Sequence, residues 1–191
     1  MEQLKKLFCI VTILFLAIPT YAQEKTEHLK FMGIPLTGNI TSFQTKLQAK
    51  GVKYDQKTSK EIKAGCRAFV GTFSGEKATI FVYYNEKTKI VYRAKAVITC
   101  LNKEAGERMY RDFESMLKSK YSTHVATESE HEGRPSISIL VTDSNIKYTL
   151  GYVGLYITNP PYHFMDELYL HIDYEDVTNE RNNTKRNMDD L

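Results

Sequence analysis

The stretch from Arg67 to Tyr121 constrains the fold most, because three strand-like runs are followed directly by one amphipathic helix. The run 77–85 is rich in β-branched and aromatic residues on both alternating faces, which is typical of a strand covered from two sides. In the run 90–100, one alternating set consists of Ile90, Tyr92, Ala94, Ala96, Ile98 and Cys100. The other set holds Val91, Arg93, Lys95, Val97 and Thr99. The alternation predicts a sheet with one apolar face and one largely polar face.

The helix that follows is predicted to cover the apolar face. Asn102 is a suitable N-cap, Glu104 lies in the first turn, and Lys118 and Lys120 lie in the last turn. Its apolar stripe recurs at steps of three and four residues and consists of Met109, Phe113, Met116, Leu117 and Tyr121.

A similar pattern occurs twice in the chain. Phe43, Leu47 and Lys50 recur as Phe113, Leu117 and Lys120, and strand-like runs near 67 and 77 have counterparts near 136 and 146. The sequence predicts an α+β protein with tandem helix-plus-three-strand units, about 29–100 and 101–177, forming an antiparallel sheet with two helices packed on one face. The alternative is that the shared pattern reflects only what any amphipathic helix looks like.

The remaining elements are read from local signals. Asn39 caps the first helix, Ile40, Phe43 and Leu47 form its buried stripe, and Gly51 ends it. A short strand is expected near 52–54, whereas the polar segments 55–65 and 122–134 are predicted to be a surface loop and a connection.

The last predicted strand spans 167–174. It places Leu168, Leu170, Ile172 and Tyr174 inward and Tyr169, His171 and Asp173 outward, with His171 solvated. From Glu175 onward we expect a frayed polar tail with at most a short helix, and 178–191 lies outside the domain.

The amino-terminal segment is predicted to be a signal peptide, residues 1–22. Lys5 and Lys6 precede an apolar run over 7–18, and small residues around Ala22 suit cleavage after that position. The run of about twelve residues is too short for a membrane anchor, which needs about 20. The domain 23–177 is therefore expected to be soluble and periplasmic or secreted, with no membrane contact after cleavage.

The charge balance argues against a nucleic-acid partner. Lys and Arg total 26 against 23 Asp and Glu, and the charges are scattered along the chain.

The chain contains no specific catalytic, nucleotide or metal signature, and we expect no cofactor. Gly71-Thr72-Phe73-Ser74-Gly75 is a hairpin turn rather than a nucleophile elbow. His124 and His131 lie in a Glu-rich polar segment without the spacing of helical metal ligands. An oxidising compartment would favour a disulfide between Cys66 and Cys100. Cys66 begins the first strand of the run and Cys100 ends the third, so in a simple meander they lie too far apart for that bond.

The motifs Gly33-Ile34-Pro35-Leu36 before Phe43-x-x-x-Leu47, Gly71-Thr72-Phe73-Ser74-Gly75, and Val91-Tyr92 ahead of a helix ending in Lys120-Tyr121 resemble a group of small exported bacterial proteins. The resemblance covers most of the mature chain and brings no catalytic residues with it. In element order alone, the architecture is similar to that of beta-lactamase inhibitor protein, a protein-binding fold.

Two surfaces are the candidate binding sites. Strand parity gathers Phe81, Tyr83, Arg93, Lys95, Tyr169 and His171 on the outward sheet face. The loop 158–166, which contains Tyr162 and Phe164, is either a lid on the core or a contact surface. The alternative for the sheet face is an ordinary half-exposed surface, which the tail would cover.

The sequence thus favours an exported, non-enzymatic binding protein for a protein or peptide partner. Two alternatives stay open: a small periplasmic hydrolase or ligand-binding enzyme with a cleft between the two units, and an envelope structural protein that self-associates.

Overall fold

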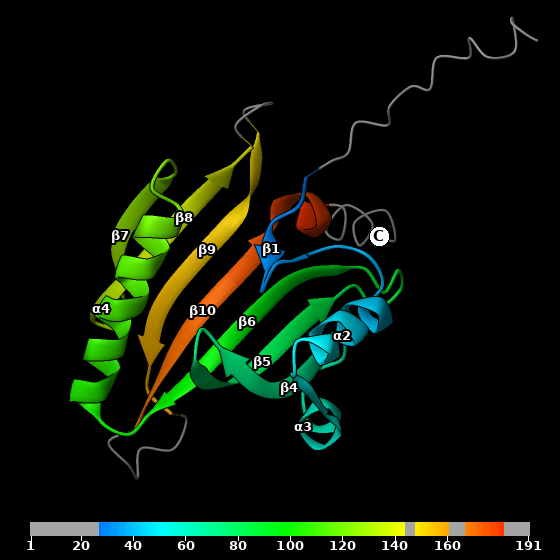
Figure 1. The fold of residues 1–191 in the computed structure, drawn as a ribbon, viewed down its shortest axis with the longest axis horizontal. Coiled ribbons are helices and arrows are strands. Elements are labelled where there is room, and N and C mark those ends of the chain that lie inside the picture. The colour runs from blue at the N-terminus through cyan, green and yellow to red at the C-terminus, as the bar shows by residue number, and fades with distance from the viewer. Residues whose placement is uncertain (1–26, 144–147, 161–166, 182–191) are drawn as a thin grey trace, which may run out of the picture.

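Within the described residues, which are 27–143, 148–160 and 167–181, the chain forms an eight-stranded antiparallel sheet (Figure 1). In this computed structural model two long helices lie on the same face of the sheet. The predicted α+β class and antiparallel sheet are confirmed. No helix among these residues is long and apolar enough to span a membrane.

The elements follow one another in two series. The first consists of β1 (Lys30–Phe31), β2 (Ile34–Pro35), α2 (Ile40–Ala49), β3 (Lys53–Asp55), α3 (Gln56–Glu61), β4 (Cys66–Phe73), β5 (Glu76–Tyr84) and β6 (Val91–Cys100). The second consists of α4 (Lys103–Lys120), β7 (Val125–His131), β8 (Arg134–Thr142), β9 (Thr149–Thr158) and β10 (Leu168–Asp176). A helical turn at 177–181 follows.

The two series meet at the centre of the sheet. The strand order is β3-β4-β5-β6-β10-β9-β8-β7, so β6 pairs with β10 and the edges are β3 and β7. β1 and β2 form a separate two-stranded sheet. In each series a long helix precedes four strands of the large sheet. The short edge strand of the first series, β3, lies where the sequence predicts a strand near 52–54, whereas the edge strand of the second, β7, was not predicted.

The helices begin and pack largely as their local sequence predicts. The Asn39 side chain accepts the backbone N–H of Thr41 at 2.8 Å, and the Asn102 side chain accepts that of Ala105 at 2.8 Å. Gly51 follows α2 with a φ of 83°, which favours glycine at that position. The stripe Ile40, Phe43 and Leu47 of α2 is buried, as are Phe113 and Leu117 of α4.

One predicted core position of α4 is wrong, and two were missed. Met116 is 47% exposed, whereas Gly106 and Tyr110 are buried. A Cβ on Gly106 would lie 2.9 Å from Leu168 Cδ1, so the missing side chain lets α4 approach β10 closely.

The face of the sheet that contacts α2 and α4 is called the inner face, and the opposite face is called the outer face. Alternating residues of the central strands are fully or almost fully buried on the inner face: Ile80, Val82, Ala94, Ala96, Ile98, Leu170 and Ile172. Each large apolar side chain buried in this way contributes on the order of 2 kcal/mol. The predicted period-two pattern is therefore confirmed for these strands.

The alternation breaks at the start of β6. The register of β5 and β6 shifts between Tyr83 and Tyr84, which is a β-bulge or similar irregularity. As a result Val91 is fully buried and Tyr92 is only partly buried, so the predicted faces of these two residues are wrong.

Two segments that the sequence predicts to be irregular are regular. Residues 125–131 of the predicted connection form β7, which is exposed along its whole length because it is an edge strand. The predicted surface loop 55–65 contains α3, whose N-cap Asp55 accepts the N–H of Thr58 at 3.0 Å.

The predicted frayed tail after Glu175 is also wrong at its beginning. Asp176 is completely buried, and its carboxylate accepts the backbone N–H groups of Leu29 and Asn179, each at 3.0 Å. His28 Nδ1 lies 3.1 Å from the same carboxylate. This carboxylate therefore joins the amino-terminal end of the described chain to its carboxy-terminal end.

Candidate binding face

The outer face carries a belt of aromatic and charged side chains across the five neighbouring strands β4, β5, β6, β10 and β9. Parity and register place the following residues there: Val70, Phe81, Tyr83, Arg93, Lys95, Tyr152, Tyr156, Tyr169, His171 and Asp173. The six outer-face residues that the sequence singles out therefore lie on one surface. Tyr162 and Phe164, which complete the predicted set, lie outside the described residues.

The centre of the belt is an ion pair between the two series. Arg93 of β6 donates from Nε to Asp173 Oδ1 at 2.8 Å and from Nη2 to Asp173 Oδ2 at 2.5 Å. Its Nε also lies 3.7 Å from a Glu175 carboxylate oxygen. Donating these hydrogen bonds to the Asp173 carboxylate raises the pKa of Arg93, so the guanidinium stays charged. The planar head is thereby fixed in one orientation.

Asp173 lies on the outward face, as the sequence predicts, but its side chain is buried rather than exposed to solvent. Its side chain is only 10% exposed, against 33% for Arg93. Strand parity predicts the face on which Asp173 lies, but it does not predict that Arg93 of the neighbouring strand covers the carboxylate.

Tyr83 and Arg93 form the second contact of the centre. The Arg93 guanidinium lies 5.2 Å from the centroid of the Tyr83 ring, in cation–π geometry. Burial raises the pKa of Tyr83 to about 12, so its phenol is protonated and can donate a hydrogen bond.

His171 does not have the solvated position that the sequence predicts. It is 9% exposed, its ring stacks on Tyr156 with centroids 4.7 Å apart, and Nε2 lies 2.8 Å from Thr158 Oγ1. Burial lowers the pKa of His171 to about 4, so the ring is neutral at physiological pH. Its Nδ1 is buried and has no hydrogen-bond partner among the described residues.

The β9 tyrosines extend the belt away from the centre. Tyr156 lies between His171 and His131, with ring centroids 4.7 Å from each, and burial raises its pKa to about 12. Tyr152 is 45% exposed. Val70, which lies on the same outer face but in β4 near the other edge of the sheet, is 42% exposed. Tyr152 and Tyr156 are four positions apart on β9 and therefore share a face, and the pairing of β9 with β10 shows that this is the outer face.

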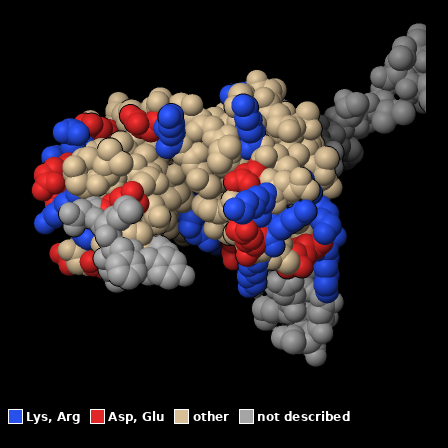
Figure 2. Space-filling model, turned by 90° about the horizontal axis from the view of Figure 1, so that it is seen from below, with Lys and Arg blue, Asp and Glu red and all other residues tan. Residues whose placement is uncertain are grey.

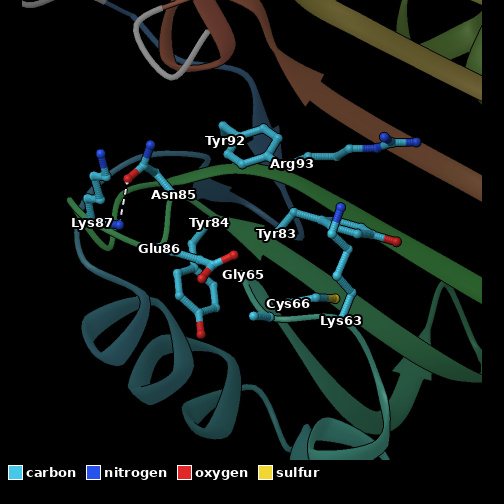
Figure 3. Close-up of a pocket in the computed structure, with 11 residues that line it drawn as sticks. Lys63, Gly65, Cys66, Tyr83, Tyr84, Asn85, Glu86, Lys87, Tyr92 and Arg93 are labelled. Carbon is cyan, nitrogen blue, oxygen red and sulfur yellow. Dashed lines mark hydrogen bonds between the residues drawn. The ribbon is translucent and has the colours of Figure 1, made fainter. Parts of the chain in front are cut away.

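At one end of β4, β5 and β6 the belt borders a hollow of about 610 Å³ (Figure 3). Tyr83 and Arg93 extend from neighbouring strands along its wall. Cys66, Tyr92 and Lys63 also line the hollow. These groups can donate hydrogen bonds and offer flat apolar rings to a ligand.

The thiols give this hollow little nucleophilic character. Burial raises the pKa of Cys66 to about 11, so the sulfur is protonated at neutral pH. Cys66 lies on the outer face and Cys100 on the inner face, and both are free thiols.

The histidines of the polar segment are separated rather than gathered. His131 contacts Tyr156, whereas His124 Nδ1 lies 3.4 Å from the Thr142 hydroxyl. Within the described ranges no group of three or more His, Cys, Asp or Glu side chains is arranged to hold a metal ion.

The charges on the visible surface are mixed. Figure 2 shows Lys and Arg side chains interleaved with Asp and Glu over the side that it presents, without a broad field of one sign. Comparisons of this chain with protein-family models, curated proteins and solved structures give no match.

Proposed function

We propose that this chain is an exported binding protein that contacts a protein or an extended peptide through the outer face of its sheet. The observation that carries the proposal is the belt of tyrosines around a fixed Arg93–Asp173 pair, on the face opposite α2 and α4. Tyrosine and arginine are enriched in the cores of protein interfaces, where they supply large contact area and directed hydrogen bonds.

The rigidity of the belt supports the same proposal. Arg93 is held by two hydrogen bonds, and His171 is held by a stacked ring and a hydroxyl. Side chains that are already ordered lose little conformational entropy when a partner binds, so their contact area contributes more fully to affinity.

The chemistry of the face favours binding over catalysis. A hydrolase needs an activated nucleophile or a general base with a pKa near the working pH. The Cys66 thiol is protonated at neutral pH, and the Nε2 atom of His171 is engaged by Thr158. The enzyme and the envelope structural protein remain alternatives to this proposal.

We further propose that the two series arose by duplication. Both run from a long helix through an edge strand to three longer strands, and the sheet order mirrors them across the β6–β10 pair. In this view the belt is formed where the two copies meet, with Arg93 from one and Asp173 from the other.

The binding proposal is tested by selecting peptides from a random-sequence phage-displayed library on the purified chain. The selected peptides are then titrated against the wild type and the variants Tyr83→Ala and Tyr152→Ala by calorimetry. We expect at least one of the two tyrosine variants to weaken binding tenfold or more, because a truncated interface anchor typically costs more than about 1 kcal/mol.

The matched control is Met116→Ala. Met116 is an exposed apolar residue of α4, so it lies on the helix side of the sheet and should not affect the selected peptides. Enrichment of no peptide, or equal losses for the control and both tyrosine variants, would reject the outer face as the site. Concentration-dependent dimers in sedimentation velocity that Tyr152→Ala abolishes would support self-association instead.

A further inference from the structure

A second hollow, of about 520 Å³, lies on the helix side of the sheet and is lined by both series. The first series contributes the β1–β2 turn, the end of α2 and the β4–β5 hairpin. The second contributes the carboxy-terminal half of α4 and one residue of β10. This is the volume of an ordinary small-molecule site, and it is separate from the outer face.

The floor of this hollow is aromatic and apolar. Phe73 and Phe113 stack with centroids 6.2 Å apart and an interplanar angle of 12°. Tyr174 joins them from β10, and all three side chains are buried, with exposed fractions of 6%, 3% and 4%. Partly exposed Met32 and Met116 add flexible thioethers at the sides, which adapt to the shape of an apolar group.

Two lysines stand at the rim. The Nζ atom of Lys120 lies 5.6 Å from the centroid of the Tyr174 ring, and a Cβ built on Gly33 would lie 3.9 Å from the Nζ atom of Lys50. Within the described ranges neither ammonium has a carboxylate at ion-pair distance. By contrast, Lys118 on the same helix contacts Glu114 at 2.8 Å and Glu128 at 2.7 Å.

The two rim lysines occupy matching places in the repeated sequence pattern. Lys50 is the C-cap of α2 and Lys120 is the last residue of α4, each three residues after the buried leucine of its helix. The fold therefore brings equivalent lysines of the two series to the rim of one hollow, and this gives the hollow two positive charges.

We propose that this hollow binds an amphipathic anion, with a carboxylate or phosphate head between Lys50 and Lys120 and an alkyl or aromatic tail on the floor. The two unpaired ammonium groups supply charge complementarity to the head. The partly exposed Met32 and Met116 side chains, together with the edges of the nearly buried rings, supply the apolar area that removes the tail from water. The site is independent of the outer face, so either proposal can fail without the other.

The test uses four probes that separate head from tail: decanoate, decyl phosphate, decanol and acetate. Binding is followed by NMR of the chain labelled with [¹³C-methyl]methionine, at probe concentrations below micelle formation. We expect decanoate and decyl phosphate to shift the Met32 and Met116 methyl signals, which line the hollow, and to leave that of Met109 in place. Decanol should bind more weakly, and acetate should not bind.

The variant is Lys50→Gln together with Lys120→Gln, and its matched control is Lys46→Gln, an exposed lysine in the last turn of α2. We expect the double variant to weaken decanoate binding about tenfold, to leave decanol binding unchanged and to remove the salt dependence. A second variant, Met116→Glu, keeps an exposed helix position folded and should also repel the anions.

Each outcome decides the proposal. If neither decanoate nor decyl phosphate shifts the Met32 and Met116 methyl signals, or if the anions bind the double variant as tightly as the wild type, the proposal is overturned. Equal affinity for decanol and decanoate in the wild type would likewise exclude a role for the lysines. If the proposal holds, tighter binding of decyl phosphate assigns a phosphate-headed lipid, and tighter binding of decanoate assigns a free carboxylate.

Discussion

The two faces of the sheet bury their side chains by different means, and β10 shows both. On the inner face Leu170 and Ile172 are completely buried among apolar neighbours. On the outer face the intervening His171 and Asp173 are 9% and 8% exposed, but they are buried against polar and aromatic partners. Apolar burial needs only shape and volume, whereas polar burial needs each specific partner, so the contacts of the outer face are the more specific of the two.

The largest expected effect is on the inner face. Leu170→Ala should lower the free energy of unfolding by about 3 kcal/mol, because it removes buried methyl groups and leaves a cavity. Tyr152→Ala on the outer face should cost less than about 1 kcal/mol, because that ring is 45% exposed. Urea unfolding of both variants checks the difference, and equal losses would show that the two faces do not differ in this way.

A smaller loss is expected at the ion pair. Asp173→Ala should cost about 2 to 3 kcal/mol, because it leaves the Arg93 guanidinium partly buried with only Glu175 nearby at 3.7 Å. The double variant Asp173→Leu/Arg93→Met removes both charges and should recover most of this loss. Urea unfolding of the wild type, Asp173→Leu, Arg93→Met and the double variant completes a double-mutant cycle, and a coupling of zero would contradict the pairing.

The third effect depends on pH. The pKa of His171 falls from its usual 6.5 to about 4 on folding, so the unfolded chain takes up this proton first as the pH drops. Its contribution is therefore fully present above about pH 6.5 and is lost as the pH falls toward about 4. At pH 5 the loss relative to pH 8 is about 2 kcal/mol.

His171→Gln should lose less stability than the wild type over this range. The charged or titratable groups that act on His171 are Lys95, Asp173 and His131, and all three are retained in the variant. Urea midpoints at pH 8 and pH 5 for both proteins isolate the histidine. Identical pH dependence in the two proteins would mean that His171 is not buried as the structure has it.

The parts of the fold that the sequence predicts are those with strong local signals. The caps at Asn39 and Asn102 and the three- and four-residue steps in α2 and α4 depend only on neighbours along the chain. Alternation is equally local, and it assigned the inner and outer residues of β10 correctly.

The two elements that were missed, β7 and α3, have a common physical cause, which is that edge and polar elements carry no apolar pattern. In β7 every residue is exposed, so the alternation that marks a strand is missing. In α3 no residue is buried, and only the Asp55 cap, which also accepts the Thr58 hydroxyl at 2.7 Å, gives a local sign of the helix.

The candidate site was predicted as a face but not as a set of contacts. Parity placed Arg93, Asp173 and His171 on one surface, yet their burial depends on which strands are neighbours. The β6–β10 pairing sets Lys95 opposite Asp173, and the β9–β10 pairing sets Tyr156 opposite His171. Pairing between distant segments is a tertiary property that a single sequence does not display. The burial of Asp176 was not predicted for the same reason, because its partner Leu29 is 147 positions away in the sequence.

The pairing of β6 with β10 also determines when this protein can finish folding. Arg93 and Asp173 are separated by 80 positions, so a nascent chain leaving the ribosome carries an open strand edge on β6 until β10 has been synthesised. Closing a loop of this length is slow compared with forming a helix or a hairpin. The middle of the sheet is thus the last part to close, and the exposed edge of β6 is where an unfinished chain is most prone to pair with the wrong partner.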